Sequence, residues 1–407
     1  MQVTERCRLS DDPLELVLDL GQQPLGNGFM DSINQAEFRY TLQCGFAPTS
    51  KLFQLISQPE PELMFHGKYA FMSETSEHMS SHFEQMFTHV VGRKVLSADS
   101  FVVEIGSNDG ILLKHFAAHQ IPHLGVEPAE YVANIAKNKG IRVLNKFFSK
   151  EIAAQIHEDY GAADVVLAAN VLCHIPSILD LASGIKTMLK ADGILIFEDP
   201  YLGDVIRLGS YDQIYDEHVF LFSALSVTEI FKRVGMELID VSHQTTHGGS
   251  MRYTLARTGA YSPNPSVSAL ISSELALGLD DARTFMVFSD RVKESGKKLR
   301  QTLEDLRSAG KRVAAYGATS KSTTIYNFAG IGADLISVIY DNSPTKIGRY
   351  SPGVHIPIVS ESEFASDAPD VTFLAAWNHQ QEILGKHQRY GIDGGRWITH
   401  VPQVRFL

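Results

Sequence analysis

The sequence predicts an α/β protein with two separate α/β units, preceded by a smaller unit of mixed structure. In the middle of the chain, buried-type strands such as FVVEIG, VVLAAN and ILIFED alternate with helical stretches, as in a doubly wound sheet. A second strand–loop–helix unit opens with RVAAYGATSKS, after a Pro/Ser-rich connection at 261–268. We therefore expect three domains, at 1–85, 86–258 and 259–407.

The remaining segments fit between these landmarks. Short apolar runs broken by turn signals such as LGQQPLGNGF predict a small mixed domain at the N-terminus. One long helical region is expected from about Ser272 to Ser308, joining the two α/β units. Strand patterns recur at LISVIYD and VTFLAAW and complete the second unit.

Composition excludes several classes of protein. The 407 residues are 44% hydrophobic and 20% charged, with a net charge of -11, so no basic field would attract nucleic acid. No apolar run approaches the roughly 20 residues that span a bilayer, and the N-terminus lacks the pattern of a signal peptide. Three cysteines form no disulfide framework. We expect a cytoplasmic protein with a small-molecule substrate and neither nucleic acid nor membrane as partner.

The first glycine loop follows a buried strand in FVVEIGSNDGILLKHF. Its glycines allow close approach of a ligand, and the helix after it offers free amides. The spacing differs from the G-x-G-x-x-G of dinucleotide sites, because Gly110 comes four residues after Gly106. Glu127 follows in HLGVEP, where such folds place a carboxylate for ribose hydroxyls. The structural alternative is a glycine turn with a solvated acid.

This pattern, with the later acid, resembles the S-adenosylmethionine (SAM) site of class I methyltransferases. The resemblance implies SAM as cofactor, and the segment after the next buried strand would line its adenine and methionine parts. The cofactor-binding residues expected on this basis are Glu104, Gly106, Ser107, Asn108, Gly110, Glu127, Asn170 and Leu172.

The whole chain resembles the three-domain SAM-dependent C-methyltransferases of nucleotide-linked 4-keto deoxysugars. The matching stretches occur in order: DLGQQPLGNGF, VEIGSNDG, GVEP, NVLCHIP, YDQIYDEHVFLFS, HGGSMR, AAYGATSKST, YDNSPTKIGRYSPGVHIPI and AAWN. The resemblance implies a small metal-binding first domain, SAM in the middle domain and the sugar nucleotide in the last. It favours dTDP as the nucleotide and a monomeric enzyme.

The first domain departs from the family pattern. The family carries two Cys-x-x-Cys pairs that together bind zinc, but here the pairs are Cys7 with Ser10 and Cys44 with Ala47. Two thiolates without further ligands make a poor structural zinc site. We therefore predict that zinc is absent or weakly bound, that no other metal is needed, and that apolar packing stabilises this domain.

The stretch YDQIYDEHVF supplies acid–base groups. A ketone at carbon 4 of a sugar makes the proton on carbon 3 acidic, so methylation needs a base and a donor to the ketone oxygen. His218 is the favoured base, with Glu217 to orient it and Tyr215 as the donor. The family's proposed catalytic cluster matches these three residues. Neighbouring strand residues point oppositely, so Glu217 and His218 share a pocket only if the segment is an irregular turn.

Three further residues are weighed for the active site. His174 follows the fourth strand of the SAM fold and matches a family histidine near the active site, the alternative being a capping or solvent histidine. Tyr69 matches a substrate-pocket tyrosine of the family, the alternative being aromatic packing between domains. His247 lies in HGGSMR, whose glycines fix a turn, and is expected to approach the sugar.

The second glycine loop, AAYGATSKST, lies at another strand-to-helix turn, so its amides and Lys321 are placed to hold a diphosphate. It lacks the P-loop spacing, which argues against ATP hydrolysis. The alternative is a structural half-Rossmann unit without a ligand. The substrate-binding residues expected are Tyr69, His247, Gly317, Thr319, Lys321, Asp341, Trp377 and Asn378.

We thus expect an enzyme that methylates carbon 3 of a nucleotide-linked 4-keto deoxysugar. Methylation at carbon 5 and a catalytically decayed nucleotide-sugar binding protein remain as alternatives. A nicotinamide dehydrogenase is disfavoured, because the dinucleotide glycine pattern is missing.

Overall fold

The computed structural model describes residues 2–64, 77–94 and 96–407. Its N-terminal unit contains a four-stranded antiparallel sheet in the order β11-β4-β3-β2. Strand β11 comes from the middle of the chain, so this sheet extends into the segment that follows YDQIYDEH. The elements are β1 (Gln2–Val3), β2 (Glu15–Pro24), β3 (Arg39–Ala47), β4 (Leu52–Leu55), β5 (Ser57–Gln58), α1 (Pro61–Met64) and β11 (Phe220–Leu221).

The middle of the chain forms a seven-stranded sheet in the order β12-β13-β10-β9-β6-β7-β8. Strands β6 to β10 are parallel in the doubly wound order, and β13 is antiparallel to both of its neighbours. This arrangement confirms the predicted class I methyltransferase fold. The strands are β6 (Val102–Ile105), β7 (His123–Val126), β8 (Val143–Leu144), β9 (Ala163–Ala169), β10 (Leu189–Pro200), β12 (Met236–Gln244) and β13 (Ser250–Arg257).

Helices cover both faces of this sheet. Alternate strand residues belong to two separate apolar clusters: Val103 and Val166 pack with α5, α6 and α8, whereas Val102 and Val165 pack with α2, α3 and α4. The two clusters make a three-layer sandwich that leaves the strand ends to carry ligands. The helices are α2 (Glu77–Arg93), α3 (Leu113–Ala118), α4 (Glu130–Asn138), α5 (Lys150–Tyr160), α6 (Ile178–Met188), α7 (Leu202–Leu208) and α8 (Ala224–Lys232).

Two helices, rather than the single helical region expected, follow the middle unit. Helix α9 (Pro265–Leu277) packs on β12 and ends at Gly278, whose φ of 78° suits a glycine cap. Helix α10 (Ala282–Ser308) begins after Asp281, whose side chain accepts from the amide of Arg283. The expectation was wrong here because both caps lie inside an otherwise helical pattern.

The C-terminal unit is a second Rossmann-like sheet in the order β16-β15-β14-β17-β18-β19, with β19 antiparallel. One apolar cluster joins its strands to α10 and to the N-terminal sheet, as in the contact of Phe46 with Phe285. The elements are β14 (Val313–Tyr316), α11 (Ser320–Ala329), β15 (Ile339–Asp341), β16 (Ile358–Ser360), α12 (Phe364–Asp367), β17 (Val371–Leu374), α13 (Gln380–Lys386), α14 (Gln388–Ile392), β18 (Arg396–Thr399) and β19 (Arg405–Phe406).

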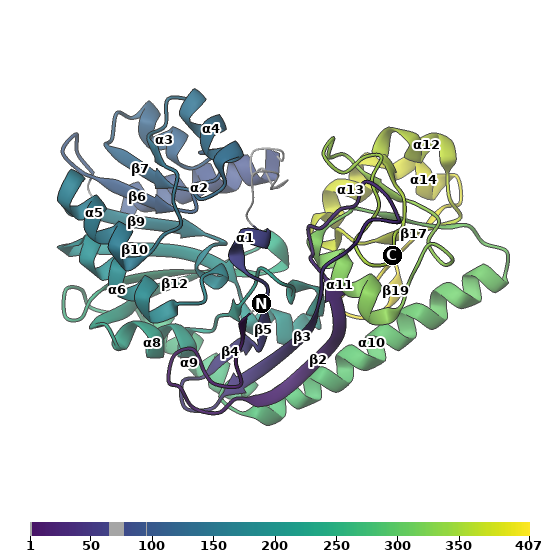
Figure 1. The fold of residues 1–407 in the computed structure, drawn as a ribbon, viewed down its shortest axis with the longest axis horizontal. Helices are drawn as coiled ribbons and strands as arrows, with labels where there is room; N and C mark the ends of the chain where they lie inside the picture. Colours follow the sequence, from purple (N-terminus) through teal and green to yellow (C-terminus); the bar gives the residue numbers. More distant parts are fainter. Residues whose placement is uncertain (1, 65–76, 95) are drawn as a thin grey trace.

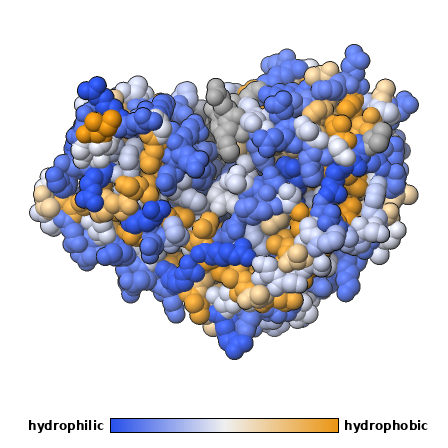
Figure 2. All heavy atoms as spheres, turned by 180° about the vertical axis from the view of Figure 1, so that it is seen from behind, coloured by the Kyte–Doolittle hydropathy of each residue, from blue (hydrophilic) through white to orange (hydrophobic). Residues whose placement is uncertain are grey.

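The two α/β units form two lobes, with β2 and β3 between them and α10 running below towards the C-terminal lobe (Figure 1). Helix α2 runs across the expected boundary at 85 and packs on the seven-stranded sheet, so we propose that the middle domain starts with α2. Seen from behind, most of the surface is hydrophilic, with scattered hydrophobic groups (Figure 2). Within the described ranges, no helix is long and apolar enough to cross a membrane.

Candidate active site

The first glycine loop is held by the strand beside it. After β6 the chain turns at Gly106, whose φ is 69° and whose amide donates to the carbonyl of Val126 at 2.7 Å. The carboxylate of Glu127 accepts from the amides of Asn108, at 3.0 Å, and Ala129, at 2.8 Å. Glu127, predicted to contact a ribose, therefore holds the loop in place through these two hydrogen bonds.

Several buried acidic side chains lie at the first glycine loop and at the end of the strand before it. Glu104 is 2% exposed, and burial above all, followed by the nearby Asp109 and Glu127, raises the pKa of Glu104 well above its usual value. Among the residues that the structure describes, Glu104 Oε2 and Ser107 Oγ are buried without a hydrogen-bond partner. SAM carries a sulfonium and an ammonium, so buried acids and oxygen atoms that can accept hydrogen bonds fit that cofactor.

The segment after β9 connects this loop to the other predicted residues. Asn170, with a φ of 56°, has its Nδ2 atom 3.2 Å from Nε2 of His247. Leu172, in the short helix η2 (Leu172–His174), is buried in an apolar cluster. His174 stacks on His218, with ring centroids 5.3 Å apart, and burial lowers the pKa of His174 to about 4.

The stretch YDQIYDEHVF has the irregular backbone that its predicted role requires. The short helix η3 (Tyr211–Gln213) leads into turns over 214–219, followed by β11. Three other residues of this stretch, Tyr211, Asp212 and Asp216, are buried rather than exposed to solvent.

Two hydrogen bonds fix the tautomer of His218. Nδ1 lies 2.6 Å from the carbonyl oxygen of Gln213, which can only accept, so Nδ1 carries the hydrogen. Burial, followed by the nearby His174, lowers the pKa of His218 well below its usual value, so the ring is neutral. Its Nε2 atom then accepts from the hydroxyl of Tyr215 at 3.0 Å. Burial and the charge of Glu217 raise the pKa of Tyr215, so the proton stays on the tyrosine.

Two acids of this stretch, Asp216 and Glu217, face the N-terminal unit. Glu217, 3% exposed, accepts from Nδ2 of Asn27 at 2.7 Å. Asp216 accepts from the amide of Gly26 at 3.0 Å, and burial above all raises its pKa to about 7. The turn after β2 therefore lies directly against the predicted catalytic residues.

The second glycine loop has the same construction as the first. The amide of Gly317, whose φ is 94°, donates to the carbonyl of Tyr340 at 2.8 Å. The carboxylate of Asp341 accepts from the amides of Ala318, at 2.7 Å, and Ser343, at 2.8 Å. Thr319 caps α11, exchanging hydrogen bonds with Ser322. Asp341 and Thr319 thus have structural contacts at the positions where ligand contacts were predicted.

Two predicted residues of the C-terminal unit, Lys321 and Trp377, contact the middle unit. Lys321 donates to the carbonyl of His247 at 3.0 Å, and burial lowers its pKa to about 8. The indole N–H of Trp377 donates to Asp212 at 2.7 Å, and a Cβ on Gly248 would lie 2.1 Å from the Trp377 ring. Asn378 is the middle residue of the short helix η6 (Trp377–His379). Tyr69 lies outside the described residues.

Sequence reasoning missed three residues beside these loops. Asn27 contacts Glu217, and the Nζ atom of Lys346 donates to the carbonyl of Ala318 at 2.8 Å. Asp199, at the end of β10, accepts from the amide of Cys173, and burial raises its pKa to about 8. The stretches that hold Asn27 and Lys346 are among those that match the family, but their spacing shows no chemistry by itself.

Comparison with known proteins agrees with this geometry. Three families match in succession: a "putative zinc binding domain" at 7–65, a "methyltransferase domain" at 77–241 and a "C-methyltransferase C-terminal domain" at 245–402. The C-methyltransferase NovU of Streptomyces niveus is 29% identical over 99% of this chain and 97% of its own length. Together, the matched domains and the near full-length similarity to NovU support a SAM-dependent C-methyltransferase.

Solved structures of methyltransferases are similar to less than half of this chain. One is a SAM-dependent methyltransferase from Anabaena variabilis, 16% identical, with 44% of this chain and 86% of that chain covered and a TM-score of 0.35. Another is magnesium protoporphyrin IX methyltransferase from Synechocystis with bound SAM, 14% identical, with 44% and 79% covered and a TM-score of 0.34.

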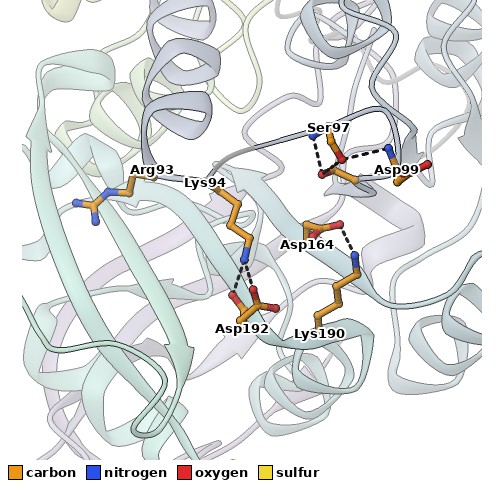
Figure 3. A pocket seen from close by; sticks show the side chains of 8 residues that line it. Arg93, Lys94, Ser97, Asp99, Asp164, Lys190 and Asp192 are labelled. Atoms are coloured by element: carbon orange, nitrogen blue, oxygen red, sulfur yellow. Dashed lines mark hydrogen bonds and ion pairs between the residues drawn. The ribbon is translucent and has the colours of Figure 1, made fainter.

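The methyltransferase also has a polar pocket of about 460 Å³ that contains none of the predicted site residues. Its lining residues lie where β6, β9 and β10 begin, whereas ligands of such sheets bind where the strands end. Figure 3 shows Lys94 reaching Asp192, at 2.6 Å, and Lys190 reaching Asp164, at 2.8 Å. Because these charges pair with one another, we assign the pocket no ligand.

The residues of the N-terminal unit do not fit a structural zinc ion. Cys7 lies 3.1 Å from the hydroxyl of Ser50, and Cys44 lies in a different apolar cluster. In the described part of the methyltransferase, one group of His, Cys, Asp or Glu side chains is close enough to share a metal, and it excludes both residues: Cys173, His174 and His218. Ala47, at a lost ligand position, is buried in the apolar core.

Proposed function

We propose that the enzyme methylates carbon 3 of a nucleotide-linked 4-keto deoxysugar, with dTDP as the favoured nucleotide. The observation that carries this proposal is a buried neutral His218 with a fixed tautomer, located between two glycine loops. When bound, SAM supplies an electrophilic methyl group on its sulfonium. The chain then has to create a nucleophilic carbon, which a ketone beside that carbon makes possible.

His218 is the base in this proposal. Because Nδ1 is engaged with the Gln213 carbonyl, Nε2 is the atom that accepts the proton from the sugar carbon. Tyr215 occupies Nε2 in this structure, so its hydroxyl has to turn away first, and the ketone oxygen of the substrate is its natural new acceptor. The negative charge of Glu217 stabilises the imidazolium that forms.

The second glycine loop and Lys321 hold the diphosphate in this proposal. The first turn of α11 offers free amides, and an anion there is favoured by the helix dipole. Lys321 also contacts the His247 carbonyl, which makes His247 a neighbour of the sugar end of the substrate. We further propose that the N-terminal unit folds without zinc and that the enzyme is a cytoplasmic monomer. Metal analysis showing one zinc per chain would refute the first of these proposals.

Deuterium exchange at the carbon beside the ketone tests the function. The wild type should bind SAM but not NAD, and should exchange and methylate a 4-keto sugar nucleotide from a small panel. His218→Ala should lower exchange by about 10²- to 10⁴-fold, whereas His157→Ala, on an exposed face of α5, should not. Exchange at the wild-type rate in His218→Ala would disprove the choice of base.

The same panel separates the alternatives. Mass spectrometry of the product distinguishes methylation at carbon 3 from methylation at carbon 5. A protein that binds the sugar nucleotide and SAM without any exchange would be a decayed binding protein instead.

A further inference from the structure

The turn after β2 joins three parts of the molecule that are far apart in sequence. The amide of Gly26 donates to Asp216, and its carbonyl accepts from the hydroxyl of Thr323 at 3.0 Å. The next residue, Asn27, contacts Glu217 at 2.7 Å and the hydroxyl of Ser320 at 2.8 Å. This turn thus connects the catalytic stretch to the first turn of α11.

Only glycine fits at the first of these positions. A Cβ on Gly26 would lie 2.8 Å from Asp216 Oδ1 and 3.2 Å from the Cβ of Ser320. The absence of a side chain lets the backbone lie between these two groups. As a result, the side chain of Asn27 is brought within hydrogen-bonding distance of both sides.

The chemistry of the partners fixes the orientation of the Asn27 amide. A carboxylate accepts hydrogen bonds, so Nδ2 of Asn27 faces Glu217 and Oδ1 faces Ser320. Ser320 must then donate its one hydroxyl hydrogen to Oδ1. The three side chains form a directed series in which Ser320 donates to Asn27 and Asn27 donates to Glu217.

We propose that Asn27 is a positioning residue that holds Glu217 beside His218 and connects it to the nucleotide-binding loop. This inference rests on the proposed function and deepens it. Ser320 is the first residue of α11, where the diphosphate is proposed to bind. Its single hydrogen goes either to Asn27 or to a phosphate oxygen. Binding of the nucleotide therefore changes the hydrogen bonding of Asn27, and through it that of Glu217.

Substitutions at Asn27 test the positioning role. Asn27→Ala should lower turnover in the deuterium exchange by about 10- to 100-fold, because a buried hydrogen bond to a charged group is lost, with SAM affinity unchanged. Asn34→Ala is the matched control, since Asn34 is exposed in the same segment. Ser320→Ala should raise the KM for the sugar nucleotide and, combined with Asn27→Ala, should lower turnover less than additively.

Asn27→Asp gives a signature that a merely structural role would not produce. Its side chain has the same shape, and when protonated it donates to Glu217 as the amide does. When ionised it repels Glu217, so exchange should fall as pH rises, relative to the wild type. This variant also keeps the test decisive if Asn27→Ala does not fold.

The outcomes separate this inference from the proposed function. One outcome overturns the role of Asn27 alone: exchange is lost in His218→Ala, but both Asn27 variants exchange at the normal rate and with the pH profile of the wild type. A pH profile of Asn27→Asp parallel to that of the wild type also overturns it. No exchange by the wild type with any sugar nucleotide of the panel overturns both.

Discussion

Binding of SAM should release a proton from Glu104. Without cofactor, burial and the neighbouring Asp109 and Glu127 keep the pKa of this carboxyl well above its usual value. A cation within about 4 to 6 Å lowers the pKa of a carboxyl by about 1 to 3 pKa units. Each pKa unit corresponds to a free energy of about 1.4 kcal/mol. Because the cation favours the ionised form, affinity for SAM should rise with pH through the raised pKa and weaken as pH falls.

Glu104→Gln removes the charge and keeps the shape. The variant should bind SAM about 10- to 1000-fold more weakly. This loss of binding free energy, about 1.4 to 4 kcal/mol, corresponds to the pKa shift of about 1 to 3 units given above. It should also release no proton from this site. Glu130→Gln is the matched control, because Glu130 is exposed in the first turn of α4.

Calorimetry in two buffers of different ionisation enthalpy measures both quantities. The wild type and Glu130→Gln should show proton release on SAM binding, and Glu104→Gln should not. Equal affinity and equal proton release in all three proteins would refute the reasoning that the buried acids select a cationic cofactor.

Three further predictions concern the described contacts. Glu198→Gln removes the carboxylate that pairs with Arg252 and His82 in the core. This variant should lower the free energy of unfolding by about 3 to 5 kcal/mol. Asp192→Asn, in an exposed pair, should change the free energy of unfolding by less than about 1 kcal/mol. Equal shifts in chemical denaturation would contradict this. Trp377→Phe loses the N–H bond to the buried Asp212 and should cost about 1 to 3 kcal/mol in the same assay; an unchanged midpoint would argue against that bond. Affinity for dTDP should fall as pH rises past about 8, because the Lys321 ammonium then loses its proton, and this dependence should be missing in Lys321→Met.

The fold was predictable because its signals are local. Each βαβ unit shows buried strands followed by glycine turns and capped helices, and the right-handed connection between parallel strands restricts how they assemble. The break between α9 and α10 was missed because glycine and aspartate residues also occur inside helices. Only the tertiary structure decides that Gly278 and Asp281 cap two separate helices.

The grouping of the proposed acid–base residues was predictable because one short stretch supplies all of them. Tyr215, Glu217 and His218 lie within four residues, and their turn brings Tyr215 onto Nε2 of His218. Asn27 and Lys346 were not predictable in this way. Their partners are 190 and 28 residues away, and an asparagine after a proline–leucine–glycine turn carries no sign of the carboxylate that it contacts.

The two glycine loops differ in charge rather than in backbone. In each, a glycine amide donates to a carbonyl near the end of the next strand, and an acid at that strand end accepts from a loop amide. Glu127 and Asp341 therefore brace their loops in the same way and do not by themselves distinguish the ligands. The first loop adds the buried Glu104, whereas the second adds Lys321 and Lys346, whose pKa values are lowered by burial. Buried acids favour a cationic ligand and buried lysines an anionic one, which supports our proposal that SAM binds at the first loop and the nucleotide diphosphate at the second.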